Sequence, residues 1–151
     1  FFSYILSFVF IGIYWGNHHH LLHAVKRVSS GIIWSNLNLL FWLSLIPFAT
    51  GWMGENHFAQ FTIAVYAALL NLCGVAYYIL QQIIVSCHEF TPKMKEAMDK
   101  QSRKGLISLA GYTLAFAMAF IQPVVSEILF VAVAIMWLVP DKNIERAYSG
   151  E

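Results

Sequence analysis

The chain has 151 residues, of which 59% are hydrophobic and 11% are charged, and its formal net charge is +1. A soluble domain usually carries about a quarter charged residues, and a domain of this size keeps a large part of its surface exposed. The composition therefore argues against a soluble globule and predicts an integral membrane protein. The Lys and Arg residues lie between apolar runs and form no basic face, so we expect no nucleic-acid partner.

Apolar segments follow one another along the whole chain, and a bilayer span needs about 20 apolar residues. We therefore predict an all-α, polytopic transmembrane helix bundle that forms one domain over residues 1–151. The expected helices lie at about residues 1–25, 31–53, 58–85, 105–121 and 124–139. The last two are separated at Pro123, because a single helix over both would be about 50 Å long and would exceed a hydrocarbon core of ~30 Å.

Positive charge alternates between the predicted links. Lys26 and Arg27 follow the first segment, and several Lys and Arg residues lie in the link over residues 86–104. The links near residues 54–57 and 122–123 carry neither, while the C-terminal tail again holds Lys142 and Arg146. By the positive-inside rule, the first helix starts outside and the C-terminus is cytoplasmic. Residues 94–103 are expected to form a short charged amphipathic stretch on the cytoplasmic face.

The densest polar feature lies toward the inner end of the first predicted helix, and it contains Trp15, Asn17, His18, His19, His20 and His23. Polar groups at membrane depth normally face the protein interior or water. We therefore expect His18 or His19 to bond to the second helix. Candidate partners are Asn36 and Asn38, with Trp34 one turn before Asn38. A purely structural interface with no ion or proton handling remains an open alternative.

A metal site is the sharper alternative for the histidines. His19 and His23 have the i, i+4 spacing that suits two ligands on one helix. Yet no carboxylate or cysteine lies nearby, and the remaining histidines, His57 and His88, are expected on opposite sides of the membrane. We therefore predict no metal, no cofactor and no catalytic residue, and we expect the protein not to be an enzyme.

Glu127, close to Pro123, fits an interfacial carboxylate near a helix N-terminus better than a pore group.

Two stretches carry a recognisable pattern. One reads Ile-Gly-Ile-Tyr-Trp-Gly-Asn-His-His from Ile11 to His19, and the other reads Asn-Leu-Leu-Phe-Trp-Leu-Ser-Leu-Ile-Pro up to Pro47, followed by Phe48, Ala49 and Thr50. Together they resemble the transmembrane protein 175 family of lysosomal and bacterial potassium channels. The similarity covers most of the chain and is strongest over residues 1–55.

The resemblance implies a potassium-selective cation channel subunit without a pore-loop filter, in a bacterial plasma membrane, with potassium ions and lipid as partners. Bacterial members have one repeat of six helices and form homotetramers. In the family, the first helix lines the pore and carries an Arg-x-x-x-Phe-Ser-Asp motif and an apolar constriction. The sequence shown has neither, so its first segment matches the family's second helix, and we expect the gate and selectivity residues to lie on a helix upstream of Phe1.

We predict a polar support network of Trp15, Asn17, His18, His19, Trp34 and Asn38. Within it, the resemblance implies a supporting role for Trp15, for His18 or His19, and for Asn38. Such groups would hold the charged residues of the pore helix, and histidine protonation near neutral pH would tune its position. No Thr-Val-Gly-Tyr-Gly filter sequence occurs in the chain.

A small proton- or ion-coupled secondary transporter is the second hypothesis, and it requires broken helices around a midplane site. A membrane enzyme with clustered histidine ligands is the third.

Overall fold

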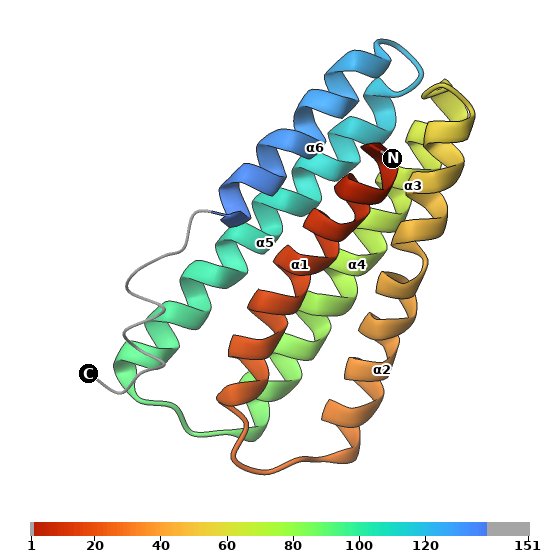
Figure 1. Cartoon of the computed structure of the whole chain (residues 1–151). Helices are drawn as coiled ribbons and strands as arrows, with labels where there is room; N and C mark the ends of the chain where they lie inside the picture. The colour runs from red at the N-terminus through yellow and green to blue at the C-terminus, as the bar shows by residue number, and fades with distance from the viewer. Residues whose placement is uncertain (1, 139–151) are drawn as a thin grey trace.

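The computed structural model describes residues 2–138, and the helices within them form one elongated bundle (Figure 1). The helices are α1 (Phe2–His23), α2 (Ser30–Ser44), α3 (Ile46–Glu55), α4 (Gln60–Cys87), α5 (Pro92–Met118) and α6 (Pro123–Leu138). No strand occurs among these residues, so the prediction of an all-α fold is confirmed. Phe1, residue 139 at the end of the last predicted helix, Lys142 and Arg146 lie outside the described residues.

The second predicted helix is present as two segments, α2 and α3, that meet at Leu45. Leu45 keeps near-helical backbone angles, with φ −84° and ψ −14°. Pro47 lies in the first turn of α3, where a missing backbone N–H is tolerated. The ring cannot support a hydrogen bond to the preceding turn, so the helix is interrupted there. The span nevertheless continues from Ser30 to Glu55 in one direction (Figure 1).

Helix α4 is the centre of the bundle and contacts α2, α3, α5 and α6. Helix α1 runs in nearly the same direction as α4, with α2 and α3 on one side and α5 and α6 on the other (Figure 1). Rings pack edge to face in the main core, where Tyr66 meets Phe10 at a centroid distance of 6.0 Å and Phe130 at 5.1 Å. A second core toward the other end of α4 contains Leu21, Leu39, Leu80, Ile84 and Met98.

The helix connections separate by charge. The connection over residues 24–29, with Lys26 and Arg27, lies at the same end of the bundle as residues 88–91 (Figure 1). The turns over residues 56–59 and 119–122 lie at the opposite end and carry neither Lys nor Arg (Figure 1). We call the first of these the basic end. The arrangement agrees with the charge alternation that the sequence predicts.

Helix α5 begins at Pro92, well before the predicted start at residue 105. Its N-cap is Thr91, whose side chain accepts a hydrogen bond from the Met94 backbone N–H, and Pro92 follows in the first turn. The predicted link over residues 86–104 is thus largely the amphipathic first half of one long helix. Ala97, Met98 and Gln101 are buried there. The prediction from hydropathy recognised only the apolar second half of α5. The predicted start of this helix at residue 105 was therefore wrong.

The segments Ser30–Glu55 and Gln60–Cys87 are long and apolar enough to cross a bilayer, and Pro123–Leu138 is a shorter apolar helix. Helix α4 has 28 residues, so at 1.5 Å per residue it is about 42 Å long, beyond a ~30 Å hydrocarbon core. The short helix α6 ends near Lys104, whose Nζ donates to the Met136 carbonyl at 3.4 Å. The charged first half of α5 extends past that level (Figure 1). The excess helix length therefore lies at the basic end.

Candidate functional site at the basic end

Helix α1 has two different faces. Phe10, Tyr14, Asn17 and Leu21 recur at helical spacing, and Phe10 and Leu21 are fully buried against the rest of the bundle. The opposite face presents Gly12, Trp15, His19 and His23, and a Cβ at Gly12 would meet nothing within 4 Å. The polar residues of α1 therefore lie on both faces. Asn17 lies on the packed face, and His19 and His23 lie on the open face.

His18 joins α1 to α2. Its Nε2 lies 2.5 Å from Oδ1 of Asn36, and both side chains are partly buried. Because an amide oxygen only accepts, His18 Nε2 carries the proton in this contact. The expected bond between this histidine cluster and the second helix is therefore present, with Asn36 as the partner.

Asn17 connects α1 to α4 through its backbone carbonyl. Its side chain donates to the Ile13 carbonyl of its own helix at 2.8 Å, while its own carbonyl accepts from Tyr77 Oη at 3.1 Å. Tyr77 Oη in turn accepts from Gln101 Nε2 at 2.7 Å. A continuous hydrogen-bonded chain thus links α1, α4 and α5. Sequence reasoning missed Tyr77 and Gln101, although a glutamine facing an apolar helix is a signal for buried pairing.

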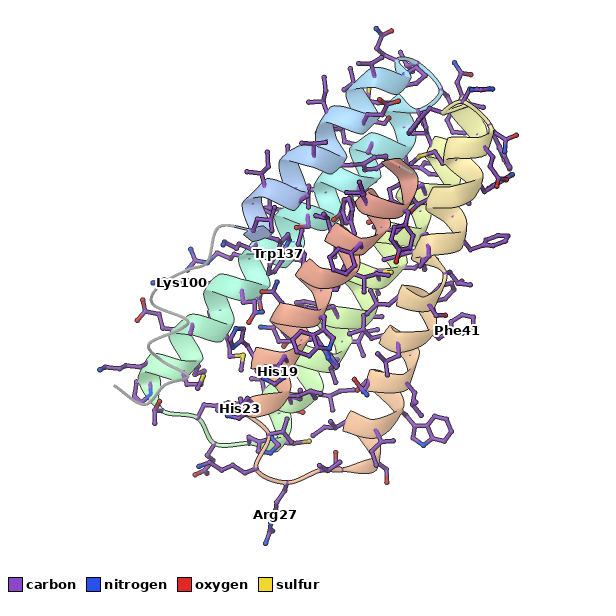
Figure 2. All side chains as sticks on the ribbon, viewed as in Figure 1. His19, His23, Arg27, Phe41, Lys100 and Trp137 are labelled. Carbon is purple, nitrogen blue, oxygen red and sulfur yellow. The ribbon has the colours of Figure 1, made fainter. Side chains whose placement is uncertain are left out.

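Trp15 and His19 lie on the open face and stack on each other. Their ring centroids are 5.1 Å apart with an interplanar angle of 8°, and His19 stacks on His23 at 5.9 Å. Trp15 is 63% exposed. Figure 2 shows His19 and His23 on the part of α1 near the basic end. Neither Trp15 nor His19 bonds to another helix within the part of the chain that the structure describes.

Within the described residues, neither Trp34 nor Asn38 forms a hydrogen bond with the polar side chains of α1. Trp34 is 72% exposed on α2. Asn38 Oδ1 accepts from Trp42 Nε1 at 3.2 Å within the same helix. Of the six residues predicted as a network, the structure brings only His18 and Asn17 into hydrogen bonds between helices, and their partners are residues outside that set.

The histidines do not assemble into a ligand set. Within residues 2–138, no group of three or more His, Cys, Asp or Glu side chains is placed to hold a metal ion. The rings of His19, His20 and His23 instead pack along one helix.

A cavity of about 40 Å³ lies between α1, α4, α5 and α6, beside Tyr77. Aromatic rings and glycines dominate its lining, which consists of Phe10, Ile13, Tyr14, Asn17, Gly74, Tyr77, Gly105, Ser108, Tyr112, Ala134 and Trp137. The Trp137 Nε1–H is already bonded to Ser108 Oγ at 2.8 Å. Ion-selective sites use rings of carbonyls or charged side chains, and no charged side chain among the described residues lines this cavity.

This chain is similar to one known protein family and to two potassium-channel proteins. The family model described as endosomal/lysosomal potassium channel TMEM175 matches residues 1–47, which include His18 and Asn36. A protein named as a potassium channel from Chryseobacterium sp. (strain P1-3) is 45% identical over 147 residues, which cover 97% of this chain and 76% of the relative. Another protein named as a potassium channel, from Streptomyces collinus, is 26% identical over 126 residues, covering 80% of this chain and 61% of the relative. No solved structure matches.

Proposed function

This chain belongs to the family of the endosomal/lysosomal potassium channel TMEM175, and we propose that it is one subunit of a potassium-selective channel. As a member of a channel family it is a membrane protein and not an enzyme. The relatives that cover most of the chain are named as potassium channels. The proposal carries that activity to this protein, with passive ion flow through a pore at the centre of a homotetramer.

The open face of α1 is the observation that supports this assembly. It combines glycines with space around them and a stack of polar aromatic rings, Trp15, His19 and His23. Glycines in membrane helices permit close approach of another helix. Polar rings at membrane depth favour a protein or water environment over lipid. We propose that this face contacts a pore-lining helix, which carries the apolar constriction and gates by narrowing and dewetting.

The His18–Asn36 hydrogen bond then keeps α1 in the position in which its open face can contact the pore-lining helix. It fixes α1 against α2 on the buried side, while Trp15 and His19 point to the open side. The Tyr77–Asn17 bond holds α1 against α4 from behind. We further propose that the basic end lies in the cytoplasm of a bacterial cell, because Lys26, Arg27 and the Lys and Arg residues in the first half of α5 lie there.

Reconstitution of the full-length protein into planar bilayers tests the proposal. The expected result is single-channel events whose reversal potential follows the potassium gradient. His18→Phe is expected to reduce the conductance at least severalfold, because the ring loses its bond to Asn36. His57→Gln, in the turn at the opposite end, is the control and should leave the currents unchanged. Absence of potassium-selective events from the wild-type protein would contradict the proposal.

A small ion-coupled secondary transporter is the second candidate, and one observation favours it. Discontinuous helices are typical of transporters, and α2 and α3 are separated by an interruption at Leu45, where the backbone stays close to helical. Saturable uptake that depends on a second ion gradient, without single-channel events, would support this candidate over the channel. Uptake is measured on the same purified protein after reconstitution into liposomes.

A further inference from the structure

His88 closes the basic end of α4. It is the C-cap residue of that helix, with extended backbone angles of φ −134° and ψ 141°. Its Nδ1 lies 3.0 Å from the carbonyl oxygen of Ile84, one of the last carbonyls of the helix. The Phe90 ring stacks on the imidazole at a centroid distance of 5.8 Å. The ring is therefore held in one orientation.

The other ring nitrogen reaches a distant part of the chain. Nε2 of His88 accepts from the backbone N–H groups of Lys26 and Arg27, each at 3.2 Å. Both amides lie in the connection over residues 24–29, which joins α1 to α2. One side chain thus ties the end of α4 to the segment that follows the histidine-rich end of α1.

The partners fix the protonation state of this ring. The Ile84 carbonyl only accepts, so Nδ1 must carry a hydrogen. The two backbone amides only donate, so Nε2 must offer its lone pair. Only the neutral imidazole with its hydrogen on Nδ1 satisfies all three contacts. A proton on Nε2 would place an N–H against two N–H groups and remove both bonds.

We propose that His88 is a proton-sensitive latch on the α1–α2 connection. The neutral ring holds the connection, and protonation at Nε2 releases it while the Nδ1–H bond to Ile84 stays in place. The latch is therefore closed while the ring is neutral and opens when acidification protonates Nε2. Release frees the basic end of α1 and does not depend on what the protein transports.

Other ionisable groups lie on the segments that meet at this ring, namely His23, Lys26, Arg27, Cys87, Glu89 and Lys93. Among the residues that the structure describes, no carboxylate forms an ion pair with His88. Arg27 extends away from the bundle (Figure 2). His23 is a second imidazole close in sequence to the same connection, so it supplies the matched control.

Hydrogen exchange of the backbone amides of Lys26 and Arg27 tests the latch. The full-length protein is measured in lipid nanodiscs at pH 7.5 and pH 5.0, and protection factors remove the pH dependence of intrinsic exchange. We expect protection at both amides to fall about tenfold at the lower pH, as the loss of one net hydrogen bond predicts. Amides in the middle of α4, such as that of Leu80, should keep their protection.

Three variants decide the origin of the effect. His88→Gln, whose side-chain oxygen accepts but does not titrate, and His88→Phe, which has no acceptor, are both expected to lose the pH dependence. His23→Gln should keep it. A wild-type protein whose protection is independent of pH would overturn the latch. So would pH dependence that persists in His88→Gln or His88→Phe, or that disappears in His23→Gln.

Discussion

Tyr77 on α4 donates its hydroxyl hydrogen to the backbone carbonyl of Asn17 on α1, at 3.1 Å. The same oxygen accepts from the buried Gln101 of α5 at 2.7 Å. The contact therefore connects three helices through one phenol group, beside the cavity that separates α1 from α5. It is also the link through which the charged first half of α5 is coupled to the polar stretch of α1.

Tyr77→Phe should destabilise the folded subunit. The change removes both hydrogen bonds of the hydroxyl, and it leaves the Gln101 amide without its acceptor in a buried site, which costs about 1–3 kcal/mol. Unfolding in mixed micelles of detergent and sodium dodecyl sulfate measures the free energy. Tyr78→Phe is the control, because no hydrogen bond of the Tyr78 hydroxyl occurs within residues 2–138 and its loss should cost well under half as much. Equal losses for the two variants would contradict the assigned role.

The bond between His18 and Asn36 predicts a coupling energy between α1 and α2. In a double-mutant cycle with His18→Phe and Asn36→Leu, we expect a coupling of about 0.5–2 kcal/mol in the free energy of unfolding. The cycle of His19→Phe with Asn36→Leu is the comparison. His19 stacks on Trp15 and His23 along its own helix, so that coupling should be close to zero. A coupling that is equal in both cycles would mean that the bond is not specific.

The sequence alone predicted the helix bundle and one of its polar contacts, but not the partner residue in that contact. The apolar runs and the alternation of charge predicted the bundle and the ends at which its connections lie, since both follow from the bilayer. The contact between His18 and α2 was also predictable, because a polar ring at that depth needs a partner. Its choice of Asn36 over Asn38 was not, since neighbouring positions on one helix differ only in rotation about the axis.

Three other features were beyond the reach of hydropathy. The start of α5 at Pro92 depends on the Thr91 cap and on the burial of Gln101, and both occur in a stretch whose average composition is polar. Trp34 was placed in the network by its spacing from Asn38, but it lies on the outer face of α2. The His88 contact joins residues 61 and 62 positions apart, and no local pattern encodes such a pairing.

Two glycines on α5 should respond in opposite ways to substitution. A Cβ at Gly111 would lie 3.2 Å from Cγ2 of Val133 on α6, a stiff β-branched side chain, whereas a Cβ at Gly105 would meet nothing within 4 Å. Gly111→Leu should therefore cost about 1–3 kcal/mol by overpacking. Gly105→Ala should stabilise by up to about 1 kcal/mol through helix propensity. Thermal unfolding in detergent ranks the two, and the reverse order would show that α5 and α6 are not in close contact there.

The two cysteines provide a test of the side on which the basic end lies. Cys73 is buried and Cys87 is exposed at the end of α4, so a maleimide that cannot cross membranes should label only Cys87. If the basic end is cytoplasmic, as its Lys and Arg residues imply, intact cells should give no labelling and inverted vesicles should give full labelling. Cys87→Ser should abolish the signal. Asn56→Cys in that background, placed in the turn at the opposite end, should be labelled in intact cells. Labelling of Cys87 from outside would reverse the orientation and with it the direction in which α1 runs through the membrane.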